Sequence, residues 1–388
     1  MYLFILFNIN DLLLVNNLKN MNNMPTLPDF PQTTRWELEY TFNNSISEES
    51  RNMIDRWEKQ NVDSLKINKV IVALSMQYTQ EWFVNIQFLE SELSRLSNEW
   101  IKTVLIAWTT WEATHLSKYE HITYVRLACK IAKKYWINII AWAWSNNTNE
   151  QSKLIDWTLW WNFAVDETIT NQFFNITKDI DILKSPWAVA TLLLSPYYIK
   201  TDNANLIKHF VDWLNRWPAI IYSIKARTWM EIPLDVLEIL SKHPNFIWVK
   251  ECDWPDRVKY LVNNWITVWT WNDDTITQDV NELWWYWVIS VTSNIVSDSV
   301  LEIVQYWWSS IGDINRNKIA SELLFPWIPN PIMIHNVTSL QRNYWEIPAI
   351  FRWPTWPISK EQQEWALKYM QVLWLNWKIF WNNYKIFV

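Results

Sequence analysis

The chain of 388 residues contains 34 tryptophans and a single glycine, Gly312. A globular protein of this length carries roughly 7% glycine, about 27 residues, and many of them adopt left-handed conformations that close turns. Trp100 and Trp136 each follow a helix-like segment and precede a strand-like segment, where a left-handed residue without a Cβ is usual. Trp284, Trp285 and Trp287 lie close together at a similar junction, before the strand-like residues 288–292. We therefore hypothesise that most tryptophan positions are glycine in the natural protein, encoded by UGA codons that are translated here as tryptophan.

Charge and composition exclude several classes of protein. The net charge of −6 and the absence of any run of five basic residues argue against a nucleic-acid partner. The two cysteines, Cys129 and Cys252, predict no disulfide framework and fit a reduced, cytoplasmic protein. The five histidines lack the spacing of metal ligands, so we expect no metal site. No apolar stretch reaches the roughly 18 residues that predict a membrane span, so no membrane association is expected.

From about residue 66, short β-branched segments alternate with amphipathic helical segments. Apolar strands joined by helical crossovers form a parallel sheet that is covered on both faces. Eight such units predict an α/β fold, the (β/α)8 TIM barrel, with a doubly wound open sheet as the alternative. The predicted strands are residues 69–76, 102–107, 137–142, 188–195, 219–224, 246–250, 266–270 and 287–292.

The predicted regions are an N-terminal extension (1–65), the barrel (66–295) and a C-terminal helical region (296–388). The extension fits no strand–helix unit, and we expect it to be poorly ordered or to lie upstream of the true start. A capping box at Ser45–Glu48 predicts one helix within it. The barrel carries an insertion near residues 150–175, to which we assign no function.

In a parallel barrel, catalytic side chains come from the carboxyl ends of the strands. Lys250 ends the apolar strand 246–250. Burial at such a position disfavours the charged form, and the neutral amine can form a Schiff base with a ketone. A lysine at a strand end can instead extend into solvent or pair with Glu251. Taken alone, Tyr222 is equally compatible with a core residue. Taken alone, Arg227 is equally compatible with a surface ion pair.

Six motifs occur in the order found in one family when tryptophan is replaced by glycine. They are WTTWEATHLSKYEH (108–121), SPYY (195–198), YSIKARTW (222–229), FIWVKE (246–251), WVISVT (287–292) and PNPI (329–332). Across about residues 66–375 the chain strongly resembles the dihydrodipicolinate synthase (4-hydroxy-tetrahydrodipicolinate synthase) family. This family belongs to the pyruvate-dependent class I aldolases, which include N-acetylneuraminate lyase.

The resemblance implies a lyase that condenses pyruvate with L-aspartate 4-semialdehyde in lysine and diaminopimelate biosynthesis. Lys250 would form an imine with pyruvate, and no other cofactor would be needed. A proton relay of three hydroxyls would fall on Tyr222, Thr109 and Tyr198, because bonded phenols can exchange protons with the intermediates.

Substrate-binding groups are implied as well. The backbone amides of Thr109 and Thr110 would hold the pyruvate carboxylate, which requires a turn without side chains in the way. The Ile289 carbonyl would line the pocket near the lysine. Arg227 would bind the carboxylate of the second substrate with bidentate geometry.

Arg227 favours the synthase, because the sugar-acid lyases of the superfamily typically lack an arginine in this loop. The alternatives are N-acetylneuraminate lyase or a related sugar-acid aldolase, and a keto-acid-binding barrel without catalysis. The family's loop has asparagine and proline where this chain has Ser223 and Lys225. Loss of the proline is expected to loosen the loop that aims Arg227.

The resemblance also implies a homo-oligomer, a dimer or a tetramer, because Tyr198 would cross a dimer interface into the neighbouring site. Four residues match positions that line an allosteric cleft for L-lysine: His121, Asn146, Glu150 and Tyr197. Lys118 stands where inhibited members often carry histidine, and its charge would repel the ammonium group of the effector. We therefore predict weak or absent inhibition by lysine.

Overall fold

The computed structural model describes residues 33–56, 67, 69–107, 113–143, 188–197, 200–270, 273–277, 287–305, 311–325, 331–342, 349–352, 355 and 357–384. Its strands are β1 (Val70–Ala73), β2 (Thr103–Ile106), β3 (Asn138–Ala143), β4 (Ala190–Leu194), β5 (Ala219–Ser223), β6 (Phe246–Glu251), β7 (Val268–Trp269) and β8 (Val288–Ser290). Its helices are α2 (Arg35–Ser45), α3 (Glu48–Asp55), α4 (Ile86–Asn98), the short η4 (Ala113–His115), α5 (Lys118–Lys134), α8 (Asn203–Leu214), α9 (Lys225–Thr228), α10 (Leu234–Leu240), α11 (Pro255–Asn263), α13 (Ser293–Gln305), α14 (Ile311–Leu324), α15 (Ile332–Arg342) and α16 (Lys360–Tyr384).

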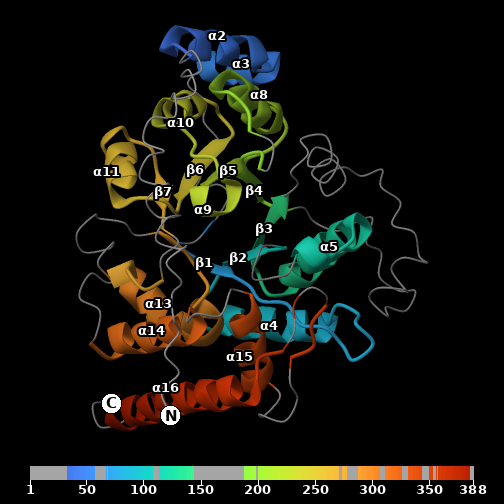
Figure 1. The fold of residues 1–388 in the computed structure, drawn as a ribbon, viewed down its shortest axis with the longest axis vertical. Coiled ribbons are helices and arrows are strands. Elements are labelled where there is room, and N and C mark those ends of the chain that lie inside the picture. Colours follow the sequence, from blue (N-terminus) through green and yellow to red (C-terminus); the bar gives the residue numbers. More distant parts are fainter. Residues whose placement is uncertain are drawn as a thin grey trace, which may run out of the picture.

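The eight strands form one parallel sheet in the order β7-β6-β5-β4-β3-β2-β1-β8. A bridge between Thr270, directly after β7, and Val288 of β8 joins the two ends of this order. The Thr270 amide donates to the Trp287 carbonyl (3.2 Å), and the Ile289 amide donates to the Thr270 carbonyl (3.1 Å). The sheet is therefore a barrel with helices around it (Figure 1). All eight predicted strands and the (β/α)8 fold are confirmed, and the open sheet is excluded.

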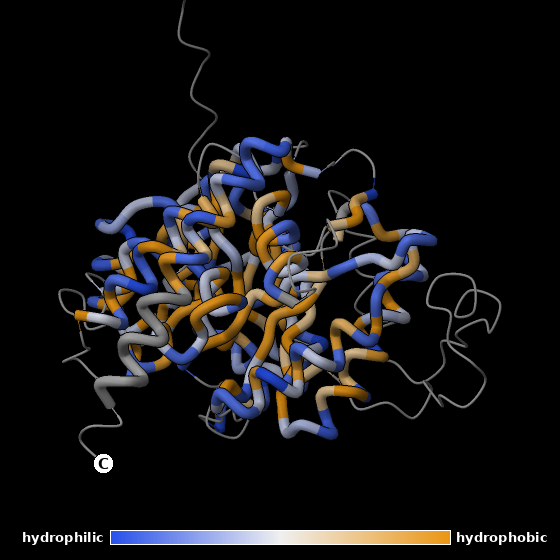
Figure 2. The backbone as a smooth tube through the Cα atoms, turned by 90° about the horizontal axis from the view of Figure 1, so that it is seen from below, coloured by the Kyte–Doolittle hydropathy of each residue, from blue (hydrophilic) through white to orange (hydrophobic). Residues whose placement is uncertain are grey.

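Buried strands form the centre of the molecule. Every residue of β1, β2, β4, β5 and β6 is buried, as expected for a parallel sheet covered on both faces. Figure 2 shows hydrophobic segments in the middle and hydrophilic segments around them. Along β5, Ile220 and Tyr222 pack in one hydrophobic cluster, whereas Ala219 and Ile221 pack in another. This alternation follows from the two-residue period of a strand.

Local capping signals set the limits of the helices. Ser117 and Glu120 form a capping box at the start of α5, and Lys133 and Lys134 lie in its last turn. Both features favour a helix at that position. Asn85 caps α4 by accepting a hydrogen bond from the Phe88 amide (2.9 Å), so the helix begins at Ile86.

Two helices, α2 and α3, lie within the predicted N-terminal extension. Helix α2 packs on α8 and α10 at one end of the barrel (Figure 1), and Leu38 and Phe42 of α2 are buried there. The predicted capping box at Ser45 is wrong, because Ser45 is the last residue of α2 and Ser47 caps α3. A capping box does occur at the start of α2, between Thr34 and Glu37.

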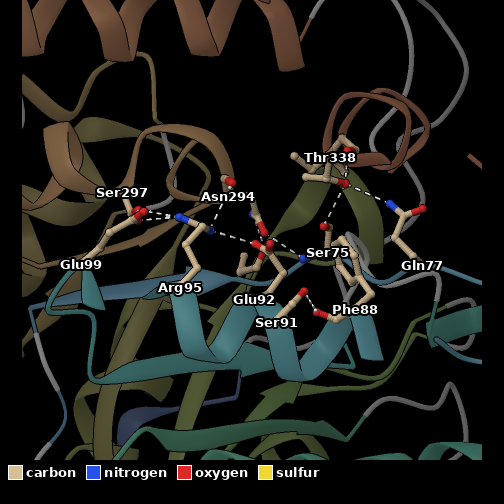
Figure 3. A network of polar contacts seen from close by, with 12 residues as sticks. Ser75, Gln77, Phe88, Ser91, Glu92, Arg95, Glu99, Asn294, Ser297 and Thr338 are labelled. Carbon is tan, nitrogen blue, oxygen red and sulfur yellow. Dashed lines mark hydrogen bonds and ion pairs between the residues drawn. The ribbon is translucent and has the colours of Figure 1, made fainter. Parts of the chain in front are cut away.

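A network of hydrogen bonds connects helices α13 and α15 to the carboxyl ends of β1 and β8 (Figure 3). Asn294 of α13 donates to the carbonyls of Ala73 and Val291 (2.8 Å each) and accepts from the Ser75 amide (2.9 Å). Ser75 in turn donates to Thr338 of α15 (3.2 Å). These bonds link the ends of the first and last strands to two helices that follow them in the sequence.

The described residues after β8 include helices α13 to α16. Helix α16 lies along α14 at the end of the molecule opposite α2 (Figure 1). Ala366, Met370 and Leu373 of α16 are buried at helical spacing. Among the described helices, none combines the length and apolar character needed to cross a bilayer. The insertion near residues 150–175 lies outside the described residues.

Five of the six residues with positive φ in the described ranges are tryptophans, namely Trp82, Trp100, Trp136, Trp229 and Trp265. Their φ angles lie between 57° and 68°, and their side chains are 52–95% exposed. The left-handed conformation costs an L-residue about 1–2 kcal/mol, and an exposed ring gains little packing in return. The prediction of left-handed backbone at Trp100 and Trp136 is therefore confirmed. These angles support the hypothesis that such positions are glycine in the natural protein.

Three further tryptophans lie close together inside the barrel. The ring centroids of Trp248 and Trp269 are 4.7 Å apart, and those of Trp269 and Trp287 are 5.2 Å apart. The indole N–H groups of Trp248 and Trp269 are buried, and no acceptor in the described part of the chain bonds them. Buried tryptophans usually find an acceptor, since an unpaired N–H costs free energy. This also agrees with the glycine hypothesis.

Candidate active site

Two predicted catalytic side chains meet at the carboxyl ends of adjacent strands. Tyr222 of β5 and Lys250 of β6 are register partners in the ladder. Lys250 is 0% exposed and Tyr222 is 1% exposed. The Nζ atom of Lys250 lies 4.4 Å from the centroid of the Tyr222 ring. The strand order thus brings together two residues that are far apart in the sequence.

The enclosure of Lys250 controls its protonation. Burial lowers the pKa of Lys250 well below its ordinary value, because the ammonium loses its hydration. Arg227 also lowers this pKa, whereas Cys252 and Asp273 raise it. Burial raises the pKa of the Cys252 thiol to about 12, so this thiol is neutral at physiological pH. Asp273 is thus the anion that opposes loss of the proton, and the balance favours the neutral, nucleophilic amine.

The Tyr222 phenol is held in its protonated form. Burial raises the pKa of Tyr222 well above its ordinary value, and Arg227 opposes this rise. A protonated phenol next to an amine can donate a proton to an oxygen atom that leaves a carbon centre.

Ile289 lies at the same mouth of the barrel. The ladder sets Lys250 opposite Trp269, and the next residue, Thr270, bridges to Val288. Ile289 follows Val288 in β8 and is fully buried. The position of the Ile289 carbonyl relative to Lys250 stays a prediction.

Asp273 orders the chain after β8. Its carboxylate accepts hydrogen bonds from the amides of Val291 (2.7 Å) and Thr292 (3.1 Å) and from the Thr292 hydroxyl (3.0 Å). Asn317 of α14 donates to the Asp273 carbonyl (2.6 Å). Burial raises the pKa of Asp273 to about 6. Its position directly after a predicted strand was the available signal, but the sequence assigned it no role.

Arg227 lies in the short helix α9, which follows β5. Its side chain is exposed, and its charge acts on the pKa values of both Lys250 and Tyr222. Trp229 ends this helix in the left-handed conformation, at φ 58°. A cation thus lies close enough to Lys250 and Tyr222 to act on their pKa values.

Two residues of the predicted allosteric cleft are described. His121 of α5 is 3% exposed, and burial lowers its pKa to about 4 despite a hydrogen bond with the backbone of Trp142. Tyr197 is half-buried and packs against the core. The remaining predicted site residues lie outside the described residues: Thr109, Thr110, Asn146, Glu150 and Tyr198.

The arrangement defines a class of protein. A (β/α)8 barrel with a buried lysine, whose pKa is lowered, beside a tyrosine at its carboxyl-terminal mouth is suited to Schiff-base chemistry on a keto compound. Among the described side chains, no group of three or more histidine, cysteine, aspartate or glutamate residues is placed to hold a metal ion.

Comparisons with known proteins show which proteins the chain resembles. Residues 184–372 match the model of the dihydrodipicolinate synthetase family. The chain is 29% identical over 314 residues to 4-hydroxy-tetrahydrodipicolinate synthase 2, chloroplastic, from Triticum aestivum, covering 79% of this chain and 73% of that protein. It is 27% identical over 241 residues to the 4-hydroxy-tetrahydrodipicolinate synthase of the archaeon Methanococcoides burtonii, covering 61% and 73%. The chain is therefore similar to members of the dihydrodipicolinate synthetase family.

Solved structures agree on the fold. The dihydrodipicolinate synthase of Acinetobacter baumannii complexed with pyruvate superposes with a TM-score of 0.65 at 23% identity, covering 79% of this chain and 99% of that one. The synthase of Aquifex aeolicus gives a TM-score of 0.64 at 23% identity, covering 79% and 97%.

Proposed function

We propose that the chain is a 4-hydroxy-tetrahydrodipicolinate synthase, a carbon–oxygen lyase of lysine and diaminopimelate biosynthesis. Its substrates are pyruvate and L-aspartate 4-semialdehyde. The observation that carries the proposal is the buried Lys250, whose Nζ lies over the ring of Tyr222 at the mouth of the barrel. The names of the relatives from a plant and an archaeon support the same activity.

The reaction begins with the neutral amine of Lys250. Its Nζ attacks the keto carbon of pyruvate, and the keto oxygen leaves as water after it receives protons, which Tyr222 is placed to supply. The methyl group of the resulting iminium loses a proton and becomes an enamine carbon. This carbon attacks the aldehyde of the semialdehyde. The amino group of the second substrate then attacks the imine carbon, closes the ring and displaces Lys250.

Other proposed roles rest on the motifs. Thr109 and Tyr198 would complete the proton relay with Tyr222, and the amides of Thr109 and Thr110 would bind the pyruvate carboxylate. The Ile289 carbonyl would face the bound pyruvate. Because pyruvate itself forms the covalent intermediate, we propose that no separate cofactor takes part.

Arg227 is the proposed binding group for the second substrate. A guanidinium forms two parallel hydrogen bonds with a carboxylate, so it fixes both the position and the orientation of that group. Its place at the rim, within electrostatic range of Lys250, fits a substrate that arrives after the imine has formed.

The assembly and the compartment are also proposals. We propose a homodimer or homotetramer in which Tyr198 reaches the partner's site, and a cleft of His121, Asn146, Glu150 and Tyr197 at which effectors bind. The two free cysteines fit the reducing cytoplasm. The plant relatives are named as chloroplastic, which is a different compartment.

Borohydride trapping tests the proposal. With pyruvate, borohydride should reduce the imine and add a stable adduct to the peptide that carries Lys250. Lys250→Arg should abolish the adduct. The matched control Lys259→Arg, in an exposed position of α11, should retain it. Absence of an adduct in the unchanged protein would leave only a binding function.

The second substrate needs its own assay. Enzyme that has not been treated with borohydride should turn over pyruvate with L-aspartate 4-semialdehyde and not with N-acetylmannosamine. Turnover with the sugar alone would make the protein a sugar-acid aldolase on the same barrel.

A further inference from the structure

The helix that carries Arg227 lacks a cap from its own sequence. Helix α9 is only four residues long, and the residue before it, Ile224, supplies no side-chain hydrogen bond to its first turn. The first amides of any helix have no partner within the helix. An acceptor from elsewhere in the chain is therefore needed to hold this turn in place.

Asp253, in the loop after β6, supplies that acceptor. Its Oδ1 atom accepts a hydrogen bond from the Lys225 amide at 2.7 Å, and its Oδ2 atom accepts one from the Ser223 hydroxyl at 3.2 Å. Helix α11 begins two residues after Asp253 and has no side-chain cap, so this carboxylate serves α9 instead of its own helix. A short bond from an amide to a carboxylate is among the stronger hydrogen bonds in proteins.

Both partners of Asp253 stand where this chain departs from the loop pattern described above, at Ser223 and Lys225. A proline at position 225 would have no amide proton to donate. The lysine therefore creates the donor that Asp253 uses. The carboxylate thus provides a constraint in place of the one that a proline ring would provide.

The loop that holds Asp253 is itself anchored to the strand of Lys250. The Asp253 amide donates to the buried carboxylate of Glu251 (3.0 Å), which also accepts from Arg257 (3.2 Å). Arg257 also donates a hydrogen bond to the carboxylate of Glu231 (2.8 Å), which follows α9 in the sequence. The side-chain pair of Lys225 and Glu231 is exposed, at 56% and 38%, so it contributes little. The main link to α9 is thus the backbone amide of Lys225.

We propose that Asp253 is a positioning residue that sets the affinity for the second substrate, because it holds α9 so that Arg227 faces the mouth of the barrel. This inference rests on the proposed function, in which Arg227 binds the carboxylate of L-aspartate 4-semialdehyde. Asp253 acts through Arg227 and has no part in imine formation at Lys250.

The test is a mutant cycle in the full-length protein, with Asp253→Ala, Asp253→Asn, Lys225→Pro and the double variant Asp253→Ala/Lys225→Pro. Asp253→Ala should raise the KM for aspartate semialdehyde about tenfold, the loss of one charge-assisted hydrogen bond. The KM for pyruvate and the yield of the borohydride adduct should stay within about twofold. Asp253→Asn, which keeps an acceptor oxygen and the same shape, should have a smaller effect.

Lys225→Pro provides the decisive comparison. Proline suits the first position of a helix and cannot donate to Asp253. In the Lys225→Pro background, Asp253→Ala should change the KM for aspartate semialdehyde by only about twofold. The hydrogen bond between Asp253 and the amide of residue 225 is already absent there. An equal effect in both backgrounds would overturn the inference.

Asp256→Ala is the matched control, since this carboxylate lies three residues further along, in the first turn of α11, and is 97% exposed. It should leave both KM values unchanged. A change in the KM for pyruvate as large as that for the semialdehyde in Asp253→Asn would also overturn the inference. Loss of the pyruvate adduct in the unchanged protein would instead contradict the proposed function.

Discussion

The Nζ atom of Lys250 lies 4.4 Å from the centroid of the Tyr222 ring, and the two residues are register partners on adjacent strands. The face of an aromatic ring stabilises a nearby cation. Tyr222 can therefore support the positive charge of the iminium with its ring and exchange protons through its hydroxyl.

Tyr222→Phe separates these two contributions. The ring remains, so pyruvate should still form the borohydride adduct at Lys250. Turnover should fall about 100-fold, the lower end of what a positioned acid or base contributes. Steady-state kinetics and adduct yield on the same preparation check this. Full turnover in the variant would contradict a proton-transfer role for Tyr222.

The pH dependence of imine formation should move in opposite directions in two charge variants. The amine reacts when neutral, so the rate of adduct formation falls at low pH, around the pKa of Lys250. This fall is the acid limb of the pH profile. Arg227→Ala removes a cation that lowers this pKa, and the limb should shift to higher pH. Asp273→Asn removes an anion that raises the pKa, and the limb should shift to lower pH. Trapping rates from pH 5 to pH 9 would measure both shifts.

Lys225→Ala is the control for these shifts, because the Lys225 ammonium is not among the charges that act on Lys250. It should leave the acid limb in place. Shifts of the same sign in Arg227→Ala and Asp273→Asn would show that structural damage, and not charge, moves the profile.

Glu251 should contribute a decrease in the free energy of unfolding as pH rises from about 5 to 7, whereas the buried His121, His209 and His243, whose pKa values are lowered, should contribute an increase. Burial raises the pKa of Glu251 from 4.5 to about 7 despite its pairing with Arg257. In this range the folded state holds a proton that the unfolded state has lost, so increasing pH favours unfolding. Glu251→Gln removes this titration, so the free energy of unfolding of the variant should rise more, or fall less, with pH than that of the unchanged protein. Urea unfolding of both proteins at several pH values would check this, and equal slopes would contradict it. Asp273, with a pKa raised to about 6, should contribute a smaller decrease that the variant retains.

Glycine at the left-handed tryptophan positions should stabilise the chain. The left-handed conformation costs tryptophan about 1–2 kcal/mol, whereas the added freedom of glycine in the unfolded chain costs roughly 0.4–1 kcal/mol. Trp100→Gly and Trp265→Gly should therefore raise the free energy of unfolding. Trp36→Gly is the control, because Trp36 is 69% exposed but lies in helix α2, where glycine should not stabilise.

The natural product tests the glycine hypothesis directly. Tryptophan at every one of the 34 positions would make the intact protein several kilodaltons heavier than glycine at most of them. Mass spectrometry therefore separates the two, and UGA codons at these positions in the coding DNA would explain them. A mass that matches tryptophan throughout would contradict the hypothesis.

Inhibition by L-lysine should be weak or absent. Lys118 begins α5, three residues before His121, and its ammonium would repel that of the effector in the proposed cleft. Lys118→His should increase sensitivity to lysine. Strong inhibition of the unchanged enzyme at sub-millimolar lysine would contradict this.

Periodicity and composition alone determined much of this protein. The alternation of apolar and amphipathic segments predicted all eight strands, and Lys250 was placed at a strand end by its position in 246–250. The misplaced capping box shows the limit of such signals. Ser45 and Glu48 have suitable spacing, yet Thr34 and Glu37 start the helix, because the packing of Leu38 and Phe42 against the barrel selects between nearby caps.

Only the tertiary structure decided which side chains act together. Closure of the barrel depends on Thr270 bonding β8, and the position of Arg227 depends on a carboxylate 28 residues from the amide it binds. Local sequence sets backbone preference and burial over a few residues. Contacts between distant residues depend on the path of the whole chain, so the pairing of Asp253 with Lys225, and of Tyr222 with Lys250, became visible only when the strands were in register.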